Sequence, residues 1–100
     1  MSRGRGIHLI DDIREVNTDE LSVISRYITN PLLINGHKFD LRVYVLVTSY
    51  DPLRVYVFKE GLARFASETY TNKLDKNNVY MHLTNYSINK KNDNFVYNEN

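Results

Sequence analysis

Three charged side chains stand at every second position of an apolar stretch of the sequence. They are Lys38, Asp40 and Arg42, and alternate residues of a β-strand project from one face of a sheet. A lysine and an arginine on that face could bind phosphates, and a carboxylate between them could orient both cations or bind a ribose hydroxyl. The pattern predicts a ligand-facing sheet surface, with a solvent-exposed row of salt bridges as the alternative.

Two further arginine-containing segments could bind anions. Between Arg3 and Ile7, glycines alternate with arginines, so backbone N–H groups and guanidinium groups could both approach phosphate oxygens. Such Arg-Gly pairs also occur in solvated N-terminal arms. Arg64 lies among small and apolar residues, where a buried arginine needs a carboxylate or phosphate partner. An arginine that reaches solvent is equally consistent with that sequence.

The segment from His82 to Lys90 combines hydroxyl, amide and ammonium groups within nine positions. This density predicts either the lining of a polar pocket or an ordinary turn rich in Asn and Ser. His82 is not a convincing metal ligand, and His8 and His37 have no partner at ligand spacing, so zinc is disfavoured. No elbow motif supports a Ser-His-Asp triad.

The elements that must position these groups are mainly strands. Alternating apolar and polar residues predict a strand over 39–49, a turn over 50–53 and a second strand over 54–59. Pro52 presets φ in the turn, and Glu60-Gly61 is expected to end the second strand. The result is an antiparallel hairpin.

Shorter elements are expected on both sides of this hairpin. Residues 81–88 fit either a strand end or an ordered loop. The other expectations are strands at 7–10 and 22–28, one helical turn within 11–20, an extended piece at 31–34 entering a turn at Asn35-Gly36, and Asn-rich surface loops at 72–78 and 90–94.

Composition narrows the class of protein. The 100 residues are 42% hydrophobic and 25% charged, which is typical of a globular chain, and the net charge of +1 gives no electrostatic footprint for nucleic acid. The chain has no cysteine, no apolar run long enough to span a membrane and no signal-peptide core. No long amphipathic helix is available to cover the sheet, so we expect a soluble, incomplete domain.

Taken together, these segments resemble the tubulin tyrosine ligase-like family of the ATP-grasp superfamily, and most closely its glutamylases. The resemblance runs from Arg3 to about Lys90. It implies an α+β fold in which residues 1–100 form the central part of an ATP-grasp domain, mainly antiparallel sheet with few short helices, ending in a polar tail at 91–100. The matching segments are Arg-Gly-Arg-Gly-Ile at 3–7, Ser-Arg-Tyr-Ile at 25–28, Pro-Leu-Leu-Ile at 31–34, Lys-Phe-Asp-Leu-Arg at 38–42, Val-Thr-Ser-Tyr-Asp-Pro-Leu at 47–53, Glu-Gly-Leu-Ala-Arg-Phe at 60–65 and Met-His-Leu-Thr-Asn-Tyr-Ser-Ile-Asn-Lys at 81–90.

The resemblance also implies roles for individual residues. Arg42 is expected near the reacting phosphates, as the catalytic residue. Arg64 is expected to bind the carboxylate of glutamate, with Tyr86 and Ser87 also on the amino-acid side. The residues expected to hold the nucleotide are Arg3, Gly4, Ser25 (where many members have glutamine), Arg26, Tyr27, Ile28, Lys38, Phe39, Asp40, Thr84 and Asn85.

The implied activity is ATP-dependent ligation of glutamate to carboxylates on tubulin tails through an acyl phosphate. Magnesium is expected as a cofactor beside ATP, with its ligands outside this segment, so these residues alone are expected to be inactive. The expected partners are tubulin and free glutamate, with no nucleic acid or membrane, for a monomer in the cytoplasm and cytoskeleton, the cilium or basal body included. The alternative is a non-catalytic remnant that binds nucleotide or tubulin without turnover.

Overall fold

The computed structural model describes residues 6–71, 73 and 75–97, and its centre is one long antiparallel hairpin. Strands β2 (His37–Tyr50) and β3 (Leu53–Thr69) form the hairpin, and β1 (Leu33–Ile34) pairs with the start of β2. The sheet order is β1-β2-β3. The prediction of a mainly antiparallel sheet is therefore confirmed.

Among the described residues, three short helices accompany the sheet: η1 (Ile13–Glu15), α1 (Val79–His82) and α2 (Tyr86–Asn89). Asp12 begins η1 with a capping box, in which its carboxylate accepts from the N–H of Arg14 and its own N–H donates to Glu15. This is the single helical turn that the sequence predicts. The segment 81–88, left open between strand end and loop, contains the end of α1 and most of α2.

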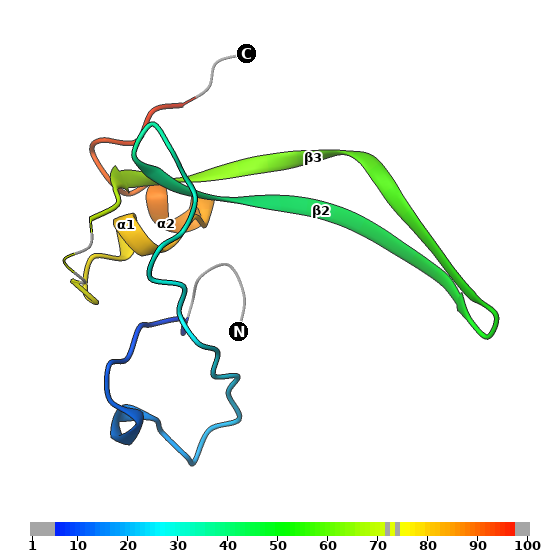
Figure 1. Cartoon of the computed structure of the whole chain (residues 1–100), viewed down its shortest axis with the longest axis horizontal. Helices are drawn as coiled ribbons and strands as arrows, with labels where there is room; N and C mark the ends of the chain where they lie inside the picture. Colours follow the sequence, from blue (N-terminus) through cyan, green and yellow to red (C-terminus); the bar gives the residue numbers. More distant parts are fainter. Residues whose placement is uncertain (1–5, 72, 74, 98–100) are drawn as a thin grey trace.

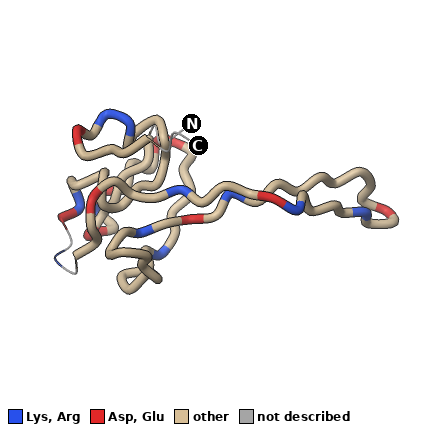
Figure 2. Tube along the Cα trace, turned by 90° about the horizontal axis from the view of Figure 1, so that it is seen from above, with Lys and Arg blue, Asp and Glu red and all other residues tan. Residues whose placement is uncertain are grey.

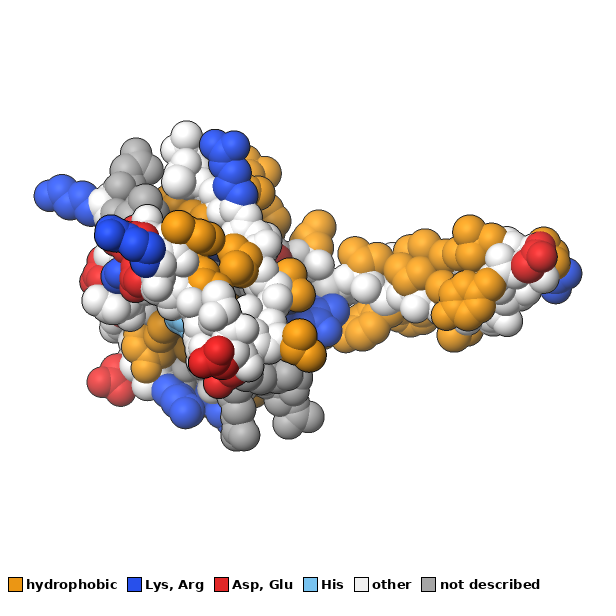
Figure 3. Space-filling model, turned by 90° about the horizontal axis from the view of Figure 1, so that it is seen from below, with side chains coloured by type: hydrophobic (Ala, Val, Ile, Leu, Met, Phe, Trp, Pro, Cys, Tyr) orange, Lys and Arg blue, Asp and Glu red, His pale blue; other side chains and the backbone are white. Residues whose placement is uncertain are grey.

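The hairpin projects away from a compact end that holds α1 and α2 (Figure 1). The radius of gyration is 16.4 Å, against about 13 Å for a compact domain of this length. We call the part of β2 and β3 that projects from this end the arm. Hydrophobic side chains cover the arm (Figure 3), and both of its strands are exposed. Such an arm buries little of its own apolar surface.

The turn between β1 and β2 follows from two residue types. Asn35 and Gly36 both have positive φ, 51° and 78°, which Asn tolerates and Gly adopts freely. These dihedral signs match the two-residue hairpin turn that Asn-Gly favours. At the other end of β2, Asp51 and Pro52 form the predicted turn, joined by a cis peptide bond. Both turn predictions are confirmed.

The predicted end of the second strand at Glu60-Gly61 is wrong, because β3 continues to Thr69. Gly61 faces Val43 across the ladder, and a Cβ there would lie 2.6 Å from the carbonyl oxygen of Arg42. Glycine is therefore required by a close backbone approach within the sheet, and it does not mark a strand end. The register also shifts beside Gly61, and Figure 1 shows the ladder bending along the arm, as bulged strands do.

The predicted strands at 7–10 and 22–28 are also wrong. Both segments lie outside the strands of the described chain, and 22–28 is largely exposed. Their β-branched and apolar residues favour extended backbone, but a strand needs a ladder partner to satisfy its N–H and C=O groups. Within the described residues neither segment has such a partner.

The buried residues lie where α1 and α2 meet the base of the hairpin. In the described part of the chain the core is small and half polar. Its members are Ala66, Tyr70, Met81, His82, Thr84 and Asn89. Polar residues in a core must be hydrogen-bonded, so this base is held together by specific contacts more than by apolar area.

Candidate functional site

The centre of the site is an ion pair between Asp40 and Arg64. The two residues face each other across β2 and β3. Arg64 Nε lies 2.7 Å from one carboxylate oxygen of Asp40, and Nη2 lies 2.6 Å from the other, which is the bidentate geometry of a strong charge-assisted pair. Arg64 therefore has the carboxylate partner that its apolar sequence neighbours predict, and that partner is Asp40 of the same sheet.

Thr84 completes the surroundings of Asp40. It lies between α1 and α2, is 8% exposed and donates from its hydroxyl to Asp40 Oδ2 at 2.9 Å. The hydrogen bond to Arg64 lowers the pKa of Asp40, and Thr84 and the nearby charge of Arg42 add to this shift against the effect of burial. Asp40 is thus a stable anion shared by a cation and a hydroxyl.

Lys38 lies two residues before Asp40 and is half-buried. Its ammonium donates to the carbonyl oxygen of His82 at 2.9 Å and lies 3.5 Å from the hydroxyl of Tyr27. The ammonium is also 4.7 Å from the centre of the Tyr27 ring, within cation–π range. Burial lowers the pKa of Lys38, and Asp40 partly opposes this.

The polar residues of the 82–90 segment are held in place by Asn89, whose side chain is fully buried. Its Oδ1 accepts from the N–H and hydroxyl of Ser67 on β3, at 2.9 and 2.7 Å. Its Nδ2 donates to the carbonyls of Leu83 and Asn85, at 2.7 and 3.0 Å. Both ends of the amide are used, so Asn89 fixes the loop that carries Thr84 against the sheet.

A hollow of 440 Å³ opens beside Lys38. It is lined by two cationic residues, Arg26 and Lys38, together with apolar and small polar ones: Ile28, Asn30, Pro31, Leu32 and Phe39. The family resemblance implies one nucleotide site for Arg26, Ile28, Lys38 and Phe39, and all four residues line this hollow. A cationic edge beside apolar walls suits a ligand with a charged part and a flat ring.

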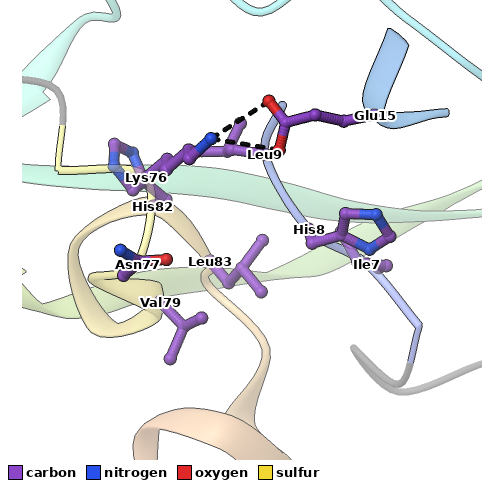
Figure 4. A pocket seen from close by; sticks show the side chains of 9 residues that line it. All are labelled: Ile7, His8, Leu9, Glu15, Lys76, Asn77, Val79, His82 and Leu83. Carbon is purple, nitrogen blue, oxygen red and sulfur yellow. Dashed lines mark hydrogen bonds and ion pairs between the residues drawn. The ribbon is translucent and has the colours of Figure 1, made fainter. Parts of the chain in front are cut away.

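A second hollow, of 290 Å³, lies between the N-terminal segment and α1 (Figure 4). Ile7, His8 and Leu9 line one side, and Val79 and His82 are among the residues on the other. Lys76 joins the two sides, because its ammonium contacts Glu15 at 3.0 Å and Asp11 at 2.9 Å. Arg3 and Gly4, predicted for the phosphate loop, lie outside the described residues.

The remaining predicted residues lie around this centre. Arg42 and Ser25 are exposed, and Ser87 is half-buried on α2. Tyr86 is also exposed, with its ring 5.8 Å from that of Phe95. Asn85 begins α2, and its carbonyl accepts from Asn89. The structure thus joins Asp40, Arg64 and Thr84 through direct contacts, with Lys38 two residues before Asp40 on β2, while Tyr86 and Ser87 lie on α2.

The described part of the chain contains no group of three or more His, Cys, Asp or Glu side chains that could hold a metal ion. In that part, no helix has the length and apolarity to cross a membrane. Basic and acidic residues are interspersed along the chain (Figure 2).

Comparison with known proteins decides the family. The model of the tubulin-tyrosine ligase family matches residues 1–100. The chain belongs to the tubulin-tyrosine ligase family. The antiparallel sheet and short helices of the described residues therefore form a portion of the domain of this family.

Several similar proteins are named as tubulin polyglutamylases. The chain is 56% identical over 97 residues to the tubulin polyglutamylase TTLL5 of Mus musculus, covering 95% of this chain and 7% of the relative. It is 55% identical over 98 residues to the tubulin polyglutamylase TTLL13 of Homo sapiens, covering 94% and 12%. It is 48% identical over 99 residues to the tubulin polyglutamylase ttll-5 of Caenorhabditis elegans, covering 97% and 14%. The chain thus spans only a small part of each relative.

Three structurally central residues of this family member were missed by sequence reasoning. The sequence gives Ser67 no role, includes Asn89 only as one member of the polar segment 82–90, and indicates no role for His82 beyond that segment because it is not a convincing metal ligand. A buried asparagine hub has no sequence signature, because Asn is usually exposed. The available signal was the density of polar groups at 82–90, which predicts a polar site without saying which member organises it.

Proposed function

We propose that this chain is part of an ATP-grasp ligase that uses ATP to join glutamate to carboxylates on tubulin tails. Family membership supports ligation, and the polyglutamylase names of the relatives support glutamate and tubulin. The observation that carries the proposal is the contact cluster of Asp40, Arg64 and Thr84, which three separate segments contribute. Lys38 lies two residues before Asp40 on β2, with its ammonium bound to the carbonyl oxygen of His82. We infer action in the cytoplasm and on the cytoskeleton, cilia included.

The chemistry of the residues fits a nucleotide. Lys38 has three N–H donors, and two acceptors engage it within the described residues, so a third donor can meet a phosphate oxygen. Arg26 adds a second cation, while Ile28 and Phe39 offer apolar contact for a base. Asp40, held as an anion, orients this side of the site. Ser25, Thr84 and Asn85 are proposed as further nucleotide contacts.

Glutamate is assigned to the Arg64 side of the cluster. The guanidinium has five N–H donors, and Asp40 takes those on Nε and Nη2 in the contacts described above. The Nη1 donors can therefore meet a substrate carboxylate without breaking the ion pair. Tyr86 and Ser87 are proposed to contact the amino acid from α2.

The reaction would proceed in two steps. An oxygen of the acceptor carboxylate takes the γ-phosphoryl group from the substrate ATP, giving an acyl phosphate and ADP. The amine of glutamate then attacks the acyl carbon, the C–O bond to phosphate breaks, and phosphate and a proton leave as the amide forms. Arg42, exposed beside Asp40, is proposed to stabilise the charge on the transferring group. Magnesium is the expected metal partner of ATP, with its ligands outside the described residues.

Mass spectrometry of tubulin tails tests the proposal directly. The full-length protein is incubated with tubulin, ATP, magnesium and glutamate, and tails gaining successive glutamyl residues are the expected result. An omission of ATP or glutamate must abolish the gain. Tails that bind the protein but never gain mass would instead support the non-catalytic alternative.

A single substitution tests the glutamate assignment. Arg64→Ala should raise the KM for glutamate at least about tenfold, the effect of losing one charge-assisted hydrogen-bond pair. Because Asp40 remains, the KM for ATP should change less. Equal increases in both constants would contradict the assignment of Arg64 to glutamate.

A further inference from the structure

His82 and Tyr27 form a hydrogen-bonded chain that ends on Lys38. His82 is 2% exposed, and its ring lies 5.4 Å from that of Tyr27 and 6.1 Å from that of Tyr70, edge to face in both cases. Both ring nitrogens are engaged: Nε2 lies 2.8 Å from the carbonyl oxygen of Asp75, and Nδ1 lies 2.7 Å from the Tyr27 hydroxyl. The imidazole is thus fixed in orientation from two sides.

These contacts determine where the protons lie. A carbonyl oxygen only accepts, so Nε2 carries the hydrogen and donates to Asp75. In the neutral ring Nδ1 is then an acceptor, and the Tyr27 hydroxyl donates to it. Burial raises the pKa of Tyr27, so that hydroxyl keeps its proton. With a neutral ring this arrangement directs the hydroxyl hydrogen to His82, while the oxygen faces Lys38 and also interacts with the side chain of Tyr70.

Lys38 is therefore held by two parts of the same unit. Its ammonium meets the main-chain oxygen of His82 at 2.9 Å, and the oxygen and ring face of Tyr27 at 3.5 and 4.7 Å. A lysine side chain has many rotamers, so fixing it in one of them costs conformational entropy. Several contacts together offset this cost. His82 also lines the second hollow.

We propose that Tyr27 and His82 are positioning residues for nucleotide binding, in which His82 Nδ1 orients the Tyr27 hydroxyl and the pair holds the Lys38 ammonium toward the phosphates. This rests on the proposed function, since it assigns Lys38 to the nucleotide. It gives Tyr27 a role through its hydroxyl, beyond its place among the residues expected to hold the nucleotide. It also gives the His82 side chain a role without a metal.

Two replacements of His82 separate this role from simple packing. In His82→Asn, the amide oxygen can stand where Nδ1 stood and accept from Tyr27. In His82→Gln, the longer amide reaches the position of Nε2 and keeps the bond to Asp75 but not the one to Tyr27. Both variants lose the ring contacts with Tyr27 and Tyr70. His82→Asn thus keeps only the Tyr27 contact and His82→Gln keeps only the Asp75 contact, so tighter ATP binding by His82→Asn reports the Nδ1 contact.

The test measures the dissociation constant for ATP, by calorimetry on the full-length protein, together with the thermal midpoint and the KM for glutamate. We expect Tyr27→Phe and His82→Gln each to weaken ATP binding about fivefold, the effect of one net hydrogen bond, with His82→Asn within about twofold of wild type. The double variant Tyr27→Phe with His82→Gln should be no weaker than either single variant, because both break the same link. The KM for glutamate should stay constant.

Three outcomes would overturn the inference. They are equal affinities of His82→Asn and His82→Gln, unchanged affinity in Tyr27→Phe, and additive losses in the double variant. If His82→Gln fails to fold, Tyr27→Phe alone still decides, because it removes one oxygen and keeps the ring. A wild-type protein that does not bind ATP at all would overturn the proposed function, and this inference with it.

Discussion

At the scale of single residues, Asp40 is the group on which the site depends. One of its carboxylate oxygens meets Arg64, and the other meets both Arg64 and Thr84. Lys38 and Arg42 stand two positions away on either side, and the charge of Asp40 acts on both neighbouring cations. A change at Asp40 is therefore expected to disturb the nucleotide and glutamate sides together.

Asp40→Asn should lower nucleotide affinity about tenfold, because the substitution removes a charge that orients the cations while keeping the shape of the side chain. The measurement is ATP binding to the full-length protein, with Asp51→Asn on the distant hairpin turn as the matched control. An affinity equal to that of the control would contradict a ligand-facing β2 at this position.

The lowered pKa of Asp40 should make the stability of the folded protein depend on pH in the acid range. Its folded pKa is lowered from 3.8, chiefly by Arg64, so the folded state holds the charged form more tightly than the unfolded chain does. This contribution is fully present above the unfolded value and is lost as pH falls through the folded pKa. We expect the difference in thermal midpoint between wild type and Asp40→Asn to shrink below about pH 4. A difference that stays constant between pH 2 and about pH 6 would contradict this.

The sequence predicts the charged face at 38–42 from alternation alone, but not the ion pair within it. Asp40 meets Arg64 only because β3 continues past Gly61 and because the bulges set the register. Bulge positions depend on packing between strands, and a single sequence carries no direct signal for them. For the same reason, the sequence alone does not identify Asp40 as the partner of Arg64.

At the scale of elements, the short helices are held by hydrogen bonds from side chains. α1 and α2 have four residues each, too few to show helical periodicity or to be stable alone. Asn78 caps α1 by accepting from Met81, and Asn89 ties α2 to β3 through Ser67. This explains why the sequence could predict the hairpin and its turns but left 81–88 undecided between strand and loop.

Asn89→Ala should destabilise the full-length protein by about 1–3 kcal/mol, because the part-buried donors of Ser67 and the carbonyl of Leu83 lose their bonds to Asn89. Chemical denaturation measures the loss. The control is Asn94→Ala, an exposed asparagine of the following turn, expected within about 0.5 kcal/mol of wild type. Hydrogen exchange should show faster exchange confined to residues 83–89. Similar losses of unfolding free energy for both variants would contradict the role of Asn89 in holding this segment against the sheet.

At the scale of the whole molecule, the hairpin arm is the largest feature and the least covered. Valines, leucines and aromatic residues of both strands are more than 40% exposed along it. An exposed apolar patch of this extent marks a surface that packs against something else, and its strand edges are open to pairing. The relatives are many times longer than this chain, so further parts of the domain are available in them.

The peptide of residues 1–100, made alone, is therefore expected to associate and to melt without a sharp transition. Size-exclusion chromatography and calorimetry measure both properties. Val45 and Val57 face each other on the arm, 55% and 62% exposed, so Val45→Lys with Val57→Glu places opposite charges across the ladder. We expect this pair to reduce association without creating a sharp melt, because the small polar core is unchanged. A monomeric wild-type peptide with a cooperative melt would show that the arm needs no cover.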